Sequence, residues 1–140
     1  MLRNWLRVLP LLVIFAYGCS GTPDDQPETG TVTGVVLLDD KPLPDARVLF
    51  SPTSSGQSSE GVTDENGKFE LRYKRDIMGA KVGEHLVKIS TFEQPVIGDD
   101  GRPSGGRPEL VPQEYNETSS LKRTVEAGEN EFEFKLQGGG

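Results

Sequence analysis

One cysteine and one histidine are the side chains best suited to chemistry in this chain of 140 residues. Cys19 ends the stretch Ala16-Tyr17-Gly18-Cys19, where an apolar run gives way to a polar one. A single cysteine excludes an internal disulfide and a zinc site built from several thiolates. No serine, cysteine or second histidine can be placed beside His85 from the sequence, so we expect an exposed or half-buried structural histidine rather than a general base.

The segment before Cys19 has the composition of a secretory signal. Arg3 and Arg7 supply positive charge, and residues 8–17 form an uncharged, mostly apolar run. This run is too short to cross a bilayer comfortably, because a spanning helix needs about 20 residues. Two alternatives stay open on the residues alone: an uncleaved signal anchor with an incidental cysteine, and a conventional signal peptide whose removal leaves a free thiol.

The order of apolar run, small residues, cysteine and polar sequel resembles the lipobox of bacterial lipoproteins. The resemblance implies that residues 1–18 are a signal peptide, and that the signal peptidase recognises Ala16, Tyr17 and Gly18. It also implies that the thiol of Cys19 is linked to diacylglycerol and that Cys19 becomes the acylated N-terminus.

Lipid on Cys19 would attach the protein to a membrane. Buried acyl chains contribute about 0.8 kcal/mol per CH₂, and several chains on one cysteine give stable anchoring. Ser20 follows the cysteine, and by resemblance to sorting in bacteria with two membranes this favours the outer membrane, on its periplasmic or surface face. Residues 19–30 are rich in proline, glycine and acidic side chains after the cysteine, which predicts a flexible tether.

The overall charge limits the classes of partner. The net charge is −7 and the isoelectric point is about 4.7. An acidic surface repels phosphate backbones, so nucleic acid is excluded as the expected partner. The 17 glycines and 10 prolines indicate many turns and few long helices.

Short segments of alternating apolar and polar residues fill residues 31–137 and predict one all-β domain. About seven short strands separated by turn residues are typical of an antiparallel β-sandwich. We expect residues 138–140 to be a disordered tail. The clearest strands are expected over residues 31–38, 46–50 and 86–91.

Two β-hairpins are also expected. Asn66 and Gly67 would supply the positive φ angles of a tight turn in the first hairpin, and residues 121–137 would form the second. Asp64 and Asn66 before Gly67 resemble part of a calcium loop, but Lys68 and Phe69 follow, which are the wrong residue types for such a loop. We therefore expect a turn, with no metal and no cofactor.

The stretch "TVTGVVLLDDKPLPDARVLF", followed by "GVTDENGKFEL", resembles the start of carboxypeptidase regulatory-like domains. These domains are also described as transthyretin-like or prealbumin-like, and Cna-B-type domains are their relatives. The later stretch "GEHLVKIS" is similar to another strand of the family. The resemblance implies a β-sandwich with prealbumin-like or Ig-like Greek-key topology. It also implies an accessory role rather than catalysis.

Residues 94–112 form a long segment dominated by glycine, proline and charge. Loops of this length are uncommon unless they bind something or are disordered. One interpretation is a disordered or loosely packed loop over the sandwich. The other is a contact loop in which Arg102 and Arg107, with Tyr115 just beyond, bind an acidic envelope protein or a glycan.

These observations predict a non-enzymatic lipoprotein of the cell envelope that presents a β-sandwich as a binding or interaction module. No catalytic residue is assigned, because no triad, metal cluster or carboxylate pair emerges from the sequence. The alternative is a structural envelope scaffold or coat component that binds no small ligand. A cleft lined by the two arginines and the tyrosine would favour the first function, and long exposed edge strands would favour the second.

Overall fold

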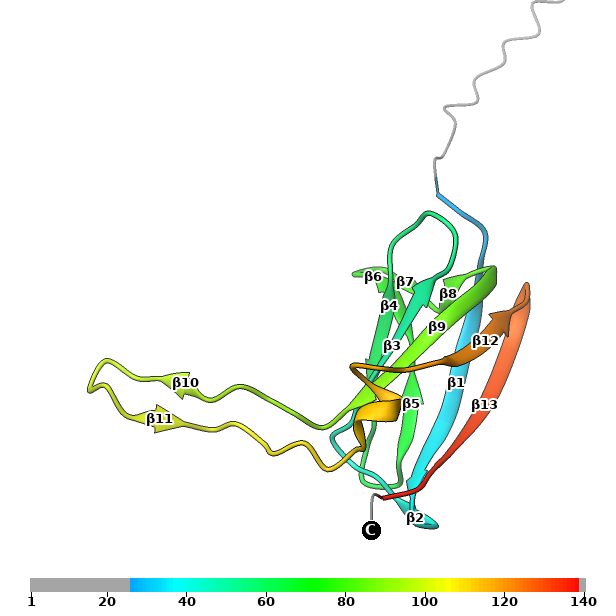
Figure 1. Cartoon of the computed structure of the whole chain (residues 1–140). Coiled ribbons are helices and arrows are strands. Elements are labelled where there is room, and N and C mark those ends of the chain that lie inside the picture. Colours follow the sequence, from blue (N-terminus) through cyan, green and yellow to red (C-terminus); the bar gives the residue numbers. More distant parts are fainter. Residues whose placement is uncertain (1–25, 139–140) are drawn as a thin grey trace, which may run out of the picture.

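The computed structural model describes residues 26–138. Within them the chain forms two β-sheets that face each other, from which a thin two-stranded ribbon projects (Figure 1). The predicted all-β sandwich is confirmed. Among these residues no helix has the length and apolar character needed to cross a bilayer. The predictions for Ala16, Tyr17, Gly18 and Cys19 fall outside the described residues.

The described chain contains thirteen strands, several of them only two residues long, and one short 3₁₀ helix. They are β1 (Thr29–Leu38), β2 (Lys41–Pro42), β3 (Arg47–Pro52), β4 (Ser59–Val62), β5 (Lys68–Glu70), β6 (Arg72–Lys74), β7 (Ile77–Met78), β8 (Ala80–Lys81), β9 (Gly83–Ser90), β10 (Val96–Ile97), β11 (Pro103–Ser104), η1 (Gln113–Tyr115), β12 (Leu121–Val125) and β13 (Gly128–Leu136). β1 thus begins at Thr29, two residues before the predicted start of the domain.

β1 is the centre of the first sheet. β13 pairs with it along one edge, and β8, β5 and β2 pair with it in turn along the other. The second sheet has the order β12-β9-β3-β4-β6-β7 and is antiparallel throughout. The pairing of β1 with β13 is parallel, which differs from the purely antiparallel sandwich that we expected.

The core lies between the two sheets and is built by alternate residues of their strands. Phe50 of the second sheet is fully buried and meets the ring of Phe134 of the first sheet, with ring centres 6.2 Å apart. The other buried apolar side chains form one cluster with these two: Val32, Val36, Leu43, Ala46, Val48, Phe69, Leu71, Ala80, Val87, Ile89, Val111, Val125 and Leu136.

The hairpin predicted over residues 121–137 is wrong. β12 pairs with β9 in the second sheet, whereas β13 pairs with β1 in the first. The Asn130 side chain stabilises the connection at which the chain crosses from the second sheet to the first. Its amide nitrogen donates to the carbonyls of Thr31 and Glu126, and its amide oxygen accepts from the Glu126 N–H. Alternation tells which face of a strand is buried, but both sheets have a buried face, so it does not tell which sheet a strand joins.

The other predicted hairpin is also a crossing between the sheets, because β4 pairs with β3 and β5 pairs with β1. Gly67 adopts the positive φ of 74° that was predicted, but Asn66 does not. The Asp64 carboxylate stabilises the turn instead, because it accepts hydrogen bonds from the N–H groups of Asn66 and Lys68, at 2.8 and 3.0 Å. The turn therefore depends on one glycine and one aspartate.

Candidate interaction surface

Residues 92–111, which we call the arm, leave the sandwich after β9 and return before η1 (Figure 1). β10 and β11 pair only with each other, so the arm is a two-stranded ribbon that stands away from both sheets. The tip turns at Gly98, whose N–H donates to the carbonyl of Arg102 and whose carbonyl accepts from the N–H of Gly101. Of the interpretations left open for this segment, loose packing over the sandwich does not hold, because the ribbon stands away from it.

The arm exposes apolar side chains to solvent. Five large hydrophobic side chains are exposed in residues 26–138, and four of them lie on the arm: Phe92 (60%), Val96 (69%), Ile97 (63%) and Leu110 (57%). Single exposed hydrophobic residues are common on soluble proteins, but a group of them on one projection is typical of an interaction site.

Ionic and backbone contacts hold the root of the arm against the sandwich. Glu93 and Arg107 exchange two backbone hydrogen bonds across the ribbon. The Arg107 guanidinium forms ion pairs with Glu93 at 2.7 Å and with Asp45, which precedes β3, at 3.2 Å. These contacts give the arm a fixed starting direction relative to the second sheet.

The Glu109 carboxylate makes a second connection between the arm and the end of β9. It accepts hydrogen bonds from the N–H groups of Thr91 at 3.0 Å and Val111 at 3.1 Å, and from the hydroxyls of Ser90 and Thr91. Partial burial raises the pKa of Glu109, but these hydrogen bonds together lower it further, so its pKa lies below the ordinary value of 4.5. The ionised carboxylate is the form that this arrangement stabilises.

Acid is expected to loosen the root of the arm. Because the pKa of Glu109 is lower in the folded protein, its stabilising contribution is complete above about pH 4.5 and is lost as the pH falls through the folded-state value. Hydrogen exchange should show the protection factors of the Thr91 and Val111 amides falling in that range. Glu109→Gln should lower the same protection factors about three- to tenfold at pH 7 and remove most of their pH dependence. Protection that is unchanged in the variant would contradict this role.

The three residues predicted to form a contact site occupy separate places. Arg102 is exposed beside the tip of the arm, whereas Arg107 forms the ion pairs at its root. Tyr115 lies in η1 and packs against the core, with its hydroxyl oxygen accepting from the N–H of Gln137 at 3.2 Å. These three side chains therefore line no common cleft, because two of them bind the protein's own groups.

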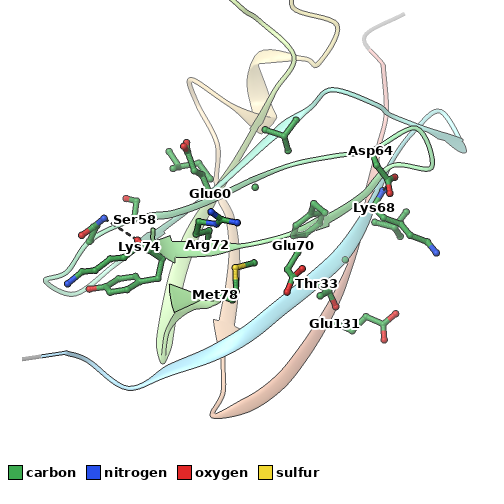
Figure 2. Close-up of a pocket in the computed structure, with 18 residues that line it drawn as sticks. Thr33, Ser58, Glu60, Asp64, Lys68, Glu70, Arg72, Lys74, Met78 and Glu131 are labelled. Carbon is green, nitrogen blue, oxygen red and sulfur yellow. Dashed lines mark hydrogen bonds between the residues drawn. The ribbon is translucent and has the colours of Figure 1, made fainter. Parts of the chain in front are cut away.

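A groove with a volume of about 1270 Å³ lies where the chain crosses from the second sheet to the first. Figure 2 shows its lining, which comes from β1, β3, β4, β5, β6, β7 and β13 together with neighbouring residues. Val62, the fifth exposed hydrophobic side chain, lines it beside the half-buried Leu49 and Met78. Gly61 lets β4 pass close to β5, because a Cβ there would lie 2.4 Å from the carbonyl oxygen of Glu70.

Charged side chains of both signs line this groove, and Glu60 of β4 lies opposite Arg72 in the strand register while Lys68 lies near Asp64 (Figure 2). Arg72 and Lys74 project from β6, while Glu70 and Glu131 project from β5 and β13. None of these four side chains forms an ion pair with another described residue. No pattern in the sequence indicates this site, since its residues come from strands that are brought together only by the fold.

His85 is fully buried, which corrects the prediction that it is exposed or half-buried. Its ring packs on Phe50 with ring centres 5.6 Å apart, and its Nε2–H donates to the carbonyl of Lys81 at 2.6 Å. Its Nδ1 and the Oγ of buried Ser59 have no partner among the described residues. β3 separates the strands that carry these two residues, so they do not form a nucleophile–base pair. The buried positions of β9 are odd-numbered, as His85 is. The alternation along this strand would therefore have predicted that the His85 side chain is buried.

Comparison with known proteins gives no family. No protein-family model and no curated protein matches the sequence. Among solved structures, the crystal structure of a 9R-lipoxygenase from Cyanothece is similar, with a TM-score of 0.45 and 17% sequence identity. The similarity covers 79% of this chain and only 16% of that one. Neither fold nor activity follows from a likeness at this level. Among residues 26–138 there is also no group of three or more side chains suited to bind a metal ion.

Proposed function

We propose that this protein is a non-enzymatic lipoprotein of the cell envelope whose sandwich presents the arm as its interaction element. The observation that carries the proposal is the concentration of exposed apolar side chains on a projection whose root is fixed by Arg107 and Glu109. Such an arrangement keeps apolar groups available to a partner at a low cost in ordering entropy.

The position of the arm suits a protein that is tethered at its N-terminus. Thr29, at the start of β1, pairs with Lys81 just before β9, and the arm leaves from the opposite end of β9. Because β1 has ten residues, the arm leaves about 30 Å from the end at which the chain enters the sandwich. If Cys19 carries lipid, the arm lies at the end of the domain that is distant from the membrane.

A structural scaffold is the second candidate, and the free edge of β13 favours it. Within the described residues this nine-residue strand pairs only with β1, so its other edge is available to another strand. However, Glu129, Glu131 and Glu133 all lie on the solvent-facing side of β13, and the same three carboxylates would face one another if two copies paired there antiparallel. Sheet extension between identical copies is therefore opposed by charge.

The anchor and the arm are tested separately. Mass spectrometry of the purified full chain should show removal of residues 1–18 and lipid on Cys19, and Cys19→Ala should release the protein from the membrane fraction. An intact N-terminus with an unmodified cysteine would refute the anchor.

For the arm, Val96→Asp with Ile97→Asp should abolish retention of envelope partners, whereas Ser120→Asp, an exposed change off the arm, should not. Unchanged partners in the arm variant would refute the interaction element.

A further inference from the structure

We propose that the arm binds the groove of a second copy of this chain, so that two copies exchange arms. The proposal rests on the proposed function, in that the arm is taken as the interaction element, and it adds the identity of the partner. Three features carry it: the charges of the two surfaces, their exposed apolar groups, and their positions on the molecule.

The arm tip and the groove have complementary unpaired charges. Asp99 and Asp100 at the tip form no ion pair with a described residue, and neither does Arg102 beside them. In the groove, the cations Arg72 and Lys74 form no ion pair with a described residue, and neither do the carboxylates of Glu70 and Glu131 (Figure 2). The unpaired carboxylates of Asp99 and Asp100 can therefore pair with Arg72 and Lys74 of a second copy.

The exposed apolar side chains also lie on the arm and in the groove. Apart from the four on the arm, the only large hydrophobic side chain exposed in residues 26–138 is Val62, which lines the groove. Contact between Val96 or Ile97 and the Val62 side of the groove would remove these groups from water together.

The two surfaces lie on the same side of the molecule and are within reach. In Figure 1 the arm leaves the lower end of the sandwich and points to the left, and β4, β6 and β7 lie on the left of the sandwich at its upper end. Asp45 joins the two regions, because its carboxylate binds Arg107 of the arm and its N–H donates to the carbonyl of Thr63 after β4. From the bridge between Glu93 and Arg107 the arm extends about 17 Å to Gly98. An arm can thus extend beyond its own sandwich to a facing copy.

Two-fold symmetry makes the exchange reciprocal, since the same pair of surfaces is present on both copies. Each copy contributes the 20 residues of its arm and the 18 residues of its groove. A specific interface uses about 20–30 residues on each side, so the two surfaces are large enough even when only part of each is in contact.

Photo-crosslinking of the full chain tests the contact directly. Benzoylphenylalanine in place of Ile97 should give a light-dependent product of twice the chain mass, in cells and in detergent solution. The crosslinked peptide should contain a groove residue, either within residues 57–78, which include most of the lining, or at residues 33–35, Leu49 or Glu131. A crosslink to another part of the second copy, or only to a different envelope protein or glycan, would overturn the proposal.

Charge reversal tests the pairing. Asp99→Lys with Asp100→Lys should weaken self-association about tenfold, because two exposed charge pairs are lost. Adding Arg72→Glu and Lys74→Glu to the same chain should restore it. The matched control adds Lys41→Glu and Lys135→Glu instead, which changes the charge equally outside the groove and should restore nothing. Restoration by the control, or no restoration by the groove variant, would overturn the proposal.

These outcomes are distinct from failure of the proposed function. A crosslink from position 97 to another envelope component would leave the arm as an interaction element and remove only self-association. No crosslink from the arm to any molecule would remove both. Membrane attachment through Cys19 is decided independently by mass spectrometry of the same full-length preparation.

Discussion

Replacing Phe50 with alanine is expected to lower the free energy of unfolding by about 3–5 kcal/mol. Phe50 is fully buried, and its ring lies 5.6 Å from that of His85, 5.8 Å from Phe132 and 6.2 Å from Phe134. β3, which carries it, pairs with neighbours on both sides, so the surrounding strands cannot easily close the cavity that the missing ring leaves. Urea denaturation followed by circular dichroism measures the loss.

The next residue along β3 supplies the control. Leu49 faces away from the core and is only half-buried, so Leu49→Ala should cost about 1 kcal/mol. Both variants should keep the same dependence of the unfolding free energy on urea concentration, because the surface exposed on unfolding is nearly unchanged. Equal losses for the two variants would show that β3 does not bury Phe50 between the sheets.

Replacing Gly67 with valine is expected to lower the free energy of unfolding by about 2–4 kcal/mol, which corresponds to a fall in Tm of about 10–20 °C. Gly67 has a φ of 74°, where a β-branched side chain is strained. A Cβ would also lie 2.5 Å from the carbonyl oxygen of Val36 and 3.1 Å from the backbone nitrogen of Leu43. Differential scanning calorimetry measures the change.

Gly101→Val is the matched control for this effect. Gly101 has nearly the same φ, 73°, but no atom lies within 4 Å of the position a Cβ would take. Its strain is confined to the tip of the arm, so global stability should change by less than about 1 kcal/mol. Calcium should leave the Tm of the wild type and of both variants unchanged. A calcium-dependent rise in the wild type would instead identify the turn at Asp64 as an ion site.

The sequence was sufficient to predict the buried faces of the strands. Ala46, Val48 and Phe50 alternate in the sequence and are all fully buried. It could not predict strand partners, because β12 and β13 are neighbours in the chain but join different sheets. The connection after Val125 looks like an ordinary turn. Its crossing depends on the Asn130 amide and on a parallel partner, β1, nearly one hundred residues away.

The candidate site was predicted only in part. The length and composition of residues 94–112 indicated an unusual segment, and Arg102 is exposed beside its tip. Arg107 was predicted as a contact residue on the same grounds, but at the root of the arm its guanidinium forms ion pairs with Glu93 and Asp45. Asp45 lies 62 residues earlier in the chain. A sequence does not show which distant carboxylate an arginine will reach. The groove was not predicted because its lining residues are also distant from one another in the chain.

The parallel pairing of β1 with β13 has a mechanical consequence. The chain enters the sandwich at Thr29 and leaves at Leu136, and these residues lie at opposite ends of the paired strands. A pulling force between a membrane attachment and a load at the other terminus would run along both strands. The paired positions from Gly30 to Leu38 would then be loaded in shear. Their hydrogen bonds to β13 would bear the force together instead of breaking one after another. A domain connected in this way resists extension at the two strands through which the force enters and leaves.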